Sequence, residues 1–256
     1  MSSTSAASLP RPVSGQPTAP SAMPSDFAYS GTELDALAAA PNYYRFIARQ
    51  FAPHTGTRAV EVGAGIGTFA EHLLRETGVR ELVAVEPAVN NYPILRERLG
   101  GRPGVRTVQG YLEDCHDVGG MDSLVAVNVL EHTPDDVSFL RAARAVLRPE
   151  GKALIFVPAV QAIYGSLDEE FEHYRRYSKR TLRRALAAGG FRDVRLRYVN
   201  SLGIAAWFLA GRVFKWRTID ASRAAFYDRW VVPWLMPVEQ IVHPPVGQSI
   251  LAIATA

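Results

Sequence analysis

Three glycines stand at alternate positions, Gly63, Gly65 and Gly67, just after a short apolar run that contains Glu61. Glycine is used where the backbone must take a positive φ or where a ligand approaches bare main chain. A helical pattern begins at Thr68, so the unpaired N–H groups and the positive dipole end of a helix would face this turn. Strand, glycine turn and helix together predict a nucleotide-binding site.

Two carboxylates narrow the choice of nucleotide. Glu86 ends the second expected strand, where its two oxygens can accept hydrogen bonds from both hydroxyls of a ribose. Glu61 would oppose a pyrophosphate and would favour a ligand that carries an ammonium and a sulfonium group. The dinucleotide-binding fingerprint has a third glycine or other small residue at the position where this chain has Thr68. The third glycine of this chain, Gly67, stands one position earlier. A nicotinamide-dependent oxidoreductase on the same fold is therefore the alternative, not the preferred function.

Residues that could take up a proton lie further along the chain. A hydroxyl or amine that acts as a nucleophile must lose its proton, which His, Asp, Glu or Tyr can accept. His132 follows the fourth expected strand, and residues 168–177 mix carboxylates and arginines with His173 and Tyr174. We expect His173 to be the base or to position the acceptor, with Tyr174 and His132 as further candidates, whereas a hydrogen-bonded lid is the alternative. No group has the spacing of metal ligands, so no metal is expected.

Short apolar segments alternate with helical patterns along most of the chain. The expected strands are residues 58–62, 81–85, 105–109, 123–130, 153–157, 191–198 and 249–253. This alternation predicts an α/β fold with a doubly wound, seven-stranded, mostly parallel sheet and helices on both faces. The last strand follows a long crossover and is compatible with an antiparallel position. Open α/β sheets bind ligands at the carboxyl ends of their strands, which is where the glycine turn lies.

The chain divides by composition into a tail, one domain and an insertion. Residues 1–25 are rich in Ser, Ala, Thr and Pro and are expected to be a disordered tail, and residues 26–256 a single domain. Residues 200–245 form an insertion before the last strand that is crowded with aromatic side chains, from Trp207 to Trp234. Such rings line small-molecule pockets, form subunit contacts or rest on lipid surfaces. An acceptor lid, a homodimer and a peripheral membrane contact all stay open.

Composition and charge exclude several classes of function. The 256 residues carry a net charge of +3, a basic excess too small and too dispersed for a nucleic-acid-binding protein. Cys115 is the only cysteine, so the chain can form neither an internal disulfide nor a cysteine-based zinc site, and we expect a cytoplasmic protein. The longest uncharged stretch beyond the tail, residues 198–211, is shorter than the roughly 20 residues of a spanning helix.

Four segments, in the expected order, resemble the motifs of class I S-adenosylmethionine (SAM)-dependent methyltransferases. They are residues 60–67 (the glycine motif), 84–87 (the acidic motif), 128–132 (after the fourth strand) and 147–152 (the turn before the fifth strand). The resemblance implies that SAM is the cofactor and that the methyl group goes to a small-molecule acceptor. Transfer to a hydroxyl is slightly favoured over transfer to an amine or a carbon. A SAM-fold module that binds without catalysis is a further alternative.

The resemblance also implies roles for individual residues. The backbone of Gly63, Ala64 and Gly65 would hold the methionine part of SAM, with Glu61 near its amino group. Residues 173–178 resemble a segment, HxRRYs, that borders the acceptor pocket in a branch of the family.

Five further residues would surround the adenosine and the sulfonium. They are Glu86 at the ribose hydroxyls, Pro87 against the adenine, Leu112 and Glu113 at the adenine edge, and Asn128 beneath the sulfonium. Relatives often have an Asp directly after the glycine that corresponds to Gly110, where this chain has Tyr111. The assignment of the adenine edge therefore departs from the family pattern.

Overall fold

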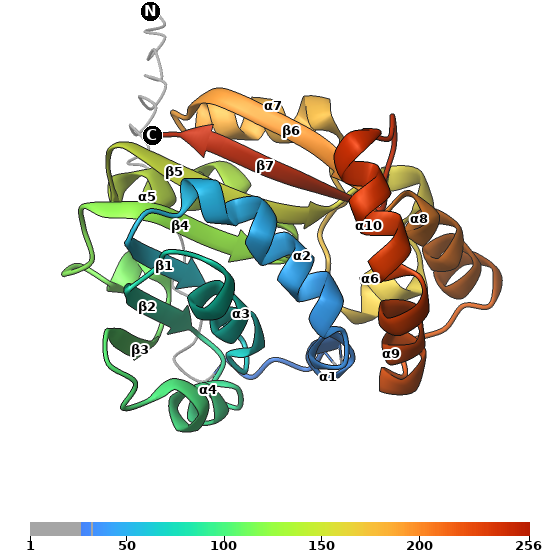
Figure 1. Cartoon of the computed structure of the whole chain (residues 1–256), viewed down its shortest axis with the longest axis horizontal. Helices are drawn as coiled ribbons and strands as arrows, with labels where there is room; N and C mark the ends of the chain where they lie inside the picture. Colours follow the sequence, from blue (N-terminus) through green and yellow to red (C-terminus); the bar gives the residue numbers. More distant parts are fainter. Residues whose placement is uncertain (1–26, 32) are drawn as a thin grey trace, which may run out of the picture.

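The computed structural model describes residues 27–31 and 33–256, and the expected tail of residues 1–25 lies outside this range. Seven strands form one sheet in the order β3-β2-β1-β4-β5-β7-β6 (Figure 1). The strands are β1 Arg58–Val62, β2 Glu81–Glu86, β3 Val105–Gln109, β4 Met121–Val127, β5 Leu147–Pro158, β6 Arg192–Val199 and β7 Ser249–Thr255. β1 to β5 pair in parallel, and β7 is antiparallel to both β5 and β6. The predicted mostly parallel sheet is confirmed.

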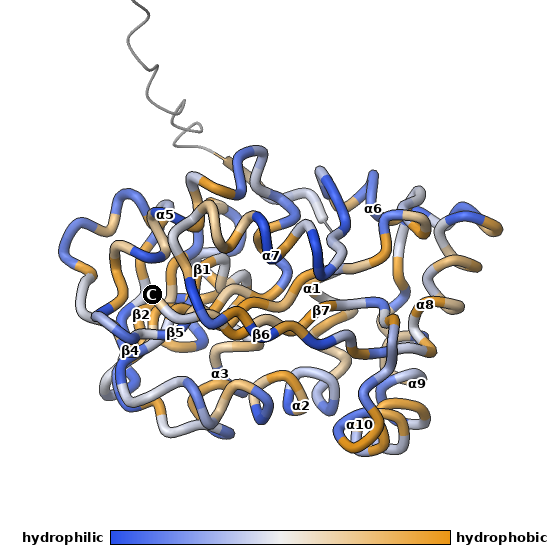
Figure 2. Tube along the Cα trace, turned by 90° about the horizontal axis from the view of Figure 1, so that it is seen from above, coloured by the Kyte–Doolittle hydropathy of each residue, from blue (hydrophilic) through white to orange (hydrophobic). Residues whose placement is uncertain are grey.

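Helices cover both faces of this sheet, as the sequence predicts. The α-helices are α1 Glu33–Ala38, α2 Pro41–Phe51, α3 Thr68–Glu76, α4 Tyr92–Leu99, α5 Asp136–Ala145, α6 Ser166–Glu170, α7 Lys179–Ala188, α8 Ser201–Phe208, α9 Ala221–Trp230 and α10 Val232–Ile241. Figure 2 shows α5 and α7 on one side of the strands and α2, α3 and α10 on the other.

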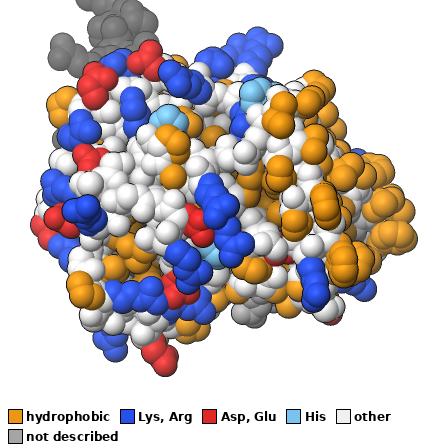
Figure 3. Space-filling model, viewed as in Figure 1, with side chains coloured by type: hydrophobic (Ala, Val, Ile, Leu, Met, Phe, Trp, Pro, Cys, Tyr) orange, Lys and Arg blue, Asp and Glu red, His pale blue; other side chains and the backbone are white. Residues whose placement is uncertain are grey.

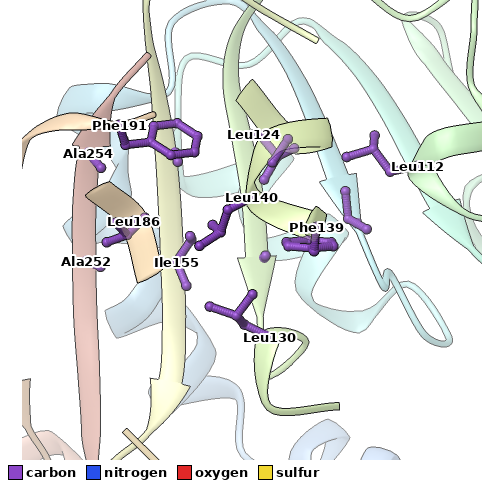
Figure 4. Packing of buried hydrophobic residues seen from close by; sticks show 14 of the residues in the cluster. Leu112, Leu124, Leu130, Phe139, Leu140, Ile155, Leu186, Phe191, Ala252 and Ala254 are labelled. Atoms are coloured by element: carbon purple, nitrogen blue, oxygen red, sulfur yellow. The ribbon is translucent and has the colours of Figure 1, made fainter. Parts of the chain in front are cut away.

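The central strands are buried on both faces, because successive side chains of a strand point to opposite sides. In β5, Ile155 packs with Leu140 of α5 and Leu186 of α7 (Figure 4). Its neighbours Leu154 and Phe156 belong to the other core cluster, with residues of α2, α3 and α10. The sheet is thus fixed from both sides, and the turns at its carboxyl ends start from rigid positions.

Most strand boundaries lie within two residues of the prediction, and two differ by more. A fourth strand that continues to residue 130 is wrong, because β4 ends at Val127 and Asn128 takes a left-handed φ of 54°. Asn is one of the few residues besides Gly that adopts this conformation readily. The chain then forms a short 3-10 turn, η3 Leu130–His132. At the other boundary, β5 begins at Leu147 and not at residue 153, since Leu147 pairs with Met121.

The segment between β6 and β7, which the sequence analysis predicts to be an insertion, is helical. α8, the π-helical segment η5 Leu209–Val213, α9 and α10 follow one another between β6 and β7. They gather next to α6 at one end of the molecule, beyond the carboxyl ends of the central strands (Figure 1). Among the described residues, the helices all lack the length and apolar character that a bilayer crossing requires.

Candidate functional site

A cavity of about 490 Å³ lies at the carboxyl ends of β1, β2 and β4. Most of the predicted cofactor residues line it, namely Glu61, Gly63, Ala64, Gly65, Glu86, Pro87 and Asn128. Its wall also contains Phe27 and Tyr29, which the sequence did not single out. Their segment is tied to the loop after β2, since Val89 N–H donates to Phe27 O and Tyr29 N–H donates to Asn90 Oδ1.

The glycine turn of this cavity has the conformation that its residue types predict. Gly63, Gly65 and Gly67 have φ angles of 66°, 56° and 83°, in the region where a side chain is strained. A Cβ on Gly63 would lie only 2.6 Å from Cγ2 of Val129. The turn therefore requires glycine, and at Gly63 and Gly65 the cavity is lined by main chain.

Glu61 is a buried carboxylate that faces this cavity. Its Oε2 has no hydrogen-bond partner among the described residues. Burial, together with the nearby Glu86 carboxylate, raises the pKa of Glu61 to about 8. A buried acid of this kind is stabilised in its ionised form by a cation. The cavity thus suits a ligand that brings a positive group to Glu61, as the ammonium and sulfonium of SAM would.

Glu86 lies in the same wall and is held by the main chain. Its Oε2 accepts a hydrogen bond from Gly65 N–H at 2.7 Å, and its Oε1 accepts one from Ala88 N–H at 3.0 Å. Burial raises the pKa of Glu86, and these backbone hydrogen bonds offset part of that rise. The side chain of Asn91 also hydrogen-bonds to this carboxylate, whose two oxygens offer about four acceptor positions in all, so Glu86 can still accept from a hydroxyl of a sugar.

Leu112 and Glu113 have a different place from the other predicted cofactor residues. Neither is among the residues that line the cavity. Leu112 begins the short 3-10 turn η2 Leu112–Asp114, and its side chain packs in the hydrophobic core (Figure 4). Asn91, which the sequence analysis did not select, lines the cavity beside Glu86 and Pro87.

A second cavity of about 300 Å³ adjoins the first. Its aromatic lining residues are Tyr43, Phe156, Phe171, Trp207, Trp216 and Tyr227. α8 and α9 contribute one side of it, and α1, α2, β5 and α6 contribute the others. Four residues line both cavities, namely Leu37, Asn128, His132 and His173. The two histidines predicted from the sequence therefore stand at the boundary between the cavities.

His173 is oriented by a buried carboxylate. Its Nδ1 lies 2.9 Å from Oδ1 of Asp168, which also accepts a hydrogen bond of 2.8 Å from Arg176 Nη1. Trp207 Nε1–H and Gly165 N–H donate to the other oxygen of Asp168. Burial raises the pKa of Asp168, but the hydrogen bond with His173 and the charge of Arg176 lower it by more. Asp168 is thus a carboxylate, which can only accept, so the proton of this hydrogen bond is on Nδ1 of His173 and Nε2 is the ring nitrogen that Asp168 does not engage.

His132 lies between two other rings. Its ring centroid is 4.8 Å from that of His173 and 5.8 Å from that of Tyr29, both in edge-on contact. Burial and the neighbouring His173 lower the pKa of His132 to about 3. This imidazole is therefore neutral at physiological pH and is a weaker base than an ordinary histidine.

Tyr174 is placed less centrally than the histidines. It lines the first cavity but not the second, and its side chain is 60% exposed. The guanidinium of Arg175 lies over its ring at 5.8 Å. The geometry therefore puts Tyr174 at the rim of the cofactor side, away from the boundary of the two cavities.

Glu131, His132 and His173 form a group that the sequence did not reveal. Each offers one potential metal-ligand atom, and these atoms lie within 4.8 Å of one another. Spacing along the chain does not show this group, because His132 and His173 are far apart in the sequence and meet only through the packing of η3 against the segment after α6. Asp168 belongs to the run of residues 168–177 that the sequence analysis considered, but its contact with His173, five residues later, is seen only in the structure.

Comparisons with known proteins agree with this geometry. Residues 36–196 match a family model described as a methyltransferase domain. A ubiquinone biosynthesis O-methyltransferase from Azorhizobium caulinodans is 32% identical over 111 residues, which cover 42% of this chain and 43% of the relative. The match therefore spans less than half the length of that relative.

Two solved structures show the same fold. A SAM dependent methyltransferase from Archaeoglobus fulgidus has a TM-score of 0.55 and 18% identity, with 84% of this chain and 94% of that chain covered. Phosphoethanolamine N-methyltransferase 2 from Haemonchus contortus, in complex with SAM, has a TM-score of 0.55 and 19% identity, with 89% of this chain and 53% of that chain covered. At 18% and 19% identity, these two similarities show a shared fold alone.

Proposed function

The chain belongs to the class I SAM-dependent methyltransferases, and we propose that it methylates a hydroxyl group of a small, largely apolar acceptor. One observation carries this proposal. Leu37, Asn128, His132 and His173 line both cavities, so the cofactor side and the acceptor side meet at a short boundary that contains a candidate base. Transfer between two bound molecules requires this kind of approach, with reacting atoms about 3 Å apart.

The residues that line the first cavity match the chemical groups of SAM. Glu61 would pair with the ammonium group, the bare main chain from Gly63 to Gly65 would hold the methionine part, and Glu86 would accept from the ribose hydroxyls. Pro87 lines the cavity next to Glu86 and would lie against the adenine. When bound, SAM supplies a methyl group that is already activated on a sulfonium.

The residues of this chain then have to place the acceptor and remove its proton. The hydroxyl oxygen gains the methyl group and loses its proton, which Nε2 of His173 takes. Asp168 holds Nδ1–H and so keeps the ring in the required tautomer. Its negative charge also stabilises the imidazolium that forms. His132 remains neutral and shapes the wall, because its lowered pKa makes it a poor proton acceptor.

The second cavity favours an uncharged acceptor with a flat, apolar body. Its walls are largely aromatic, and several of its polar groups are already bonded to one another. Tyr227 Oη donates to Asn200 Oδ1, Asn200 Nδ2 donates to Gln248 Oε1, and Asp228 accepts from the backbone N–H groups of Asn42 and Tyr43. A charged acceptor would find few free partners there. The name of the relative from A. caulinodans specifies transfer to oxygen, which supports a hydroxyl acceptor.

Two measurements test this function. Calorimetric titration should show binding of SAM and none of NAD, and the reverse result would favour the oxidoreductase. Incubation with SAM and a panel of phenols, aliphatic alcohols and amines should convert a hydroxylated acceptor into its methyl ether, in which a methyl group replaces the hydroxyl proton. Methylation of amines alone would contradict the hydroxyl acceptor, and SAM binding without turnover on any acceptor would favour a non-catalytic binding subunit.

A further inference from the structure

The helical insertion carries most of the exposed apolar side chains of the described chain. Fourteen large hydrophobic residues are exposed, and all except Ile94 and Tyr174 lie between Leu202 and Val246. Figure 3 shows hydrophobic side chains gathered at the end of the molecule where α8, α9 and α10 lie in Figure 1. Monomeric soluble proteins rarely expose apolar side chains in such a concentration without a binding role.

α10 shows the pattern most clearly. Its inner positions Val232, Met236 and Glu239 are buried, and Glu239 accepts hydrogen bonds from Asn200 and Ser201. Its outer positions include Trp234, which is 77% exposed, and Ile241, which is 84% exposed. Glu239 is the only charged residue of the helix, so the outward face carries no charge at all. The outer face is thus as apolar as the inner one.

The exposed charges of this segment are mostly positive. The exposed cations of the insertion are Arg212, Lys215, Arg217, Arg223 and Arg229. Of its three acids, only Asp220 is exposed, since Asp228 and Glu239 are buried. A symmetric contact between two copies would bring these cations together and would be opposed by their repulsion. A negatively charged partner would instead be attracted to them.

We propose that the outer face of α8, α9 and α10 rests on the surface of an anionic phospholipid bilayer. Apolar side chains with tryptophan at their centre and a rim of Arg and Lys are what a helix in the headgroup region requires. Trp230 and Trp234 suit this position, because an indole ring places its apolar body in the acyl boundary and its N–H near water. The protein lies on the membrane and does not cross it, which agrees with the absence of a spanning helix among the described residues.

The same helices have a second, inner face toward the acceptor cavity. Gly203, Ala206 and Trp207 of α8 and Ala224 and Tyr227 of α9 line that cavity, while Phe208 and Phe226 point outward. A membrane contact would therefore bring the acceptor side, and not the cofactor side, to the lipid. The proposed contact depends on the surface alone and does not require the proposed acceptor.

Vesicle co-sedimentation of the full chain tests the proposal. The protein should sediment with vesicles that contain phosphatidylglycerol, much less with phosphatidylcholine alone, and less as salt rises, since salt screens the cations within a Debye length of about 10 Å at 0.1 M. The double variant Trp234→Ser with Ile241→Ser should lower the partition coefficient by about ten-fold or more, because it removes apolar area from the interface. Tryptophan fluorescence of the wild type should shift to the blue on vesicle addition.

Two further variants test the role of the cations and provide a control for the loss of apolar surface. Lys215→Glu with Arg229→Glu should lower binding to anionic vesicles without a change in thermal unfolding, and neither residue lines a cavity. Ile94→Ser, which alters an apolar side chain of 45% exposure on α4, should bind like the wild type. Equal binding by all variants, or no binding at low salt, would overturn the proposal. So would a dimer of the wild type that dissociates in the Trp234→Ser, Ile241→Ser variant and shows no vesicle binding, because the face would then join two copies.

Discussion

The two cavities of this methyltransferase are built in different ways. The first takes its wall mainly from the turns that directly follow β1, β2 and β4, with the glycine turn as its floor. The second is enclosed by segments that are scattered from Ala36 to Ser249 and brought together by α8 and α9. The first therefore depends on local backbone conformation, whereas the second depends on how distant helices pack. Variants that alter the first cavity should lose cofactor binding, whereas variants that alter the second cavity should lose turnover.

The largest expected effect is on the acceptor side, at His173. His173→Asn should lower turnover by about 10²- to 10⁴-fold, because the acceptor hydroxyl loses its proposed base. SAM affinity should change little. His132→Asn is the matched control: with a pKa of about 3, His132 takes up little of the proton, and its loss should affect turnover much less. Steady-state kinetics and calorimetry of both variants measure the difference. If both variants lost turnover equally, His173 would have no special role.

The second-largest effect is expected when the negative charge of Asp168, which holds the ring of His173, is removed. Asp168→Asn leaves the buried guanidinium of Arg176 without its carboxylate partner, which should lower the free energy of unfolding by about 3–5 kcal/mol. Urea denaturation measures this loss. The neighbouring, exposed Glu169→Gln serves as the control and should change stability little. A stable Asp168→Asn variant with normal turnover would contradict the orienting role of this carboxylate.

On the cofactor side, Gly63→Ala should weaken both the fold and SAM binding. The new Cβ would meet Val129 Cγ2 at 2.6 Å in a backbone with positive φ. We expect a loss of about 2–4 kcal/mol in unfolding free energy, from backbone strain and overpacking together. Gly101→Ala has a similar φ of 80° with nothing within 4 Å, and should lose only about 1–2 kcal/mol with unchanged SAM affinity. Equal losses for the two variants would show that contact with Val129 is unimportant.

The smallest expected effect is a pH dependence that belongs to Glu61. In the free protein its pKa of about 8 means that it is protonated at neutral pH, and a cationic ligand favours its ionised form. SAM binding should therefore release a proton, and affinity should rise with pH up to about 8, by at most about ten-fold per pH unit. Calorimetry in two buffers of different ionisation enthalpy measures the released proton. Glu61→Gln should abolish the release, and an unchanged release would assign it to another group.

The same group should make the free protein less stable as pH rises. The pKa of Glu61 is about 8 in the folded state and near its ordinary value of 4.5 in the unfolded chain. Between these two values the folded state holds a proton that the unfolded state has lost, so the contribution of Glu61 to stability falls as pH increases and levels off above pH 8. Bound SAM should reduce this trend, since it offsets the cost of the buried charge.

The sheet and most of the residues that line the first cavity were predictable from the sequence, for local reasons. Strand periodicity located the strands, and the motif from Glu61 to Gly67 located the turn, because both reflect interactions between residues close in the chain. The end of β4 was misjudged, since the apolar run continues to Leu130 while the left-handed backbone of Asn128 ends the strand earlier. The adenine edge was assigned to Leu112 by family resemblance, whereas the side chain packs into the core.

The sequence by itself determined the fold class, the glycine turn and the carboxylates Glu61 and Glu86 that face the cofactor cavity. Only the tertiary structure decided that His132 and His173 share a boundary, that Asp168 holds the ring of His173, and that one face of α10 stays exposed while the other is buried. The reason is physical. Backbone conformation and burial periodicity are set by neighbours in the chain, whereas contacts between side chains far apart in sequence exist only after the helices have packed on the sheet.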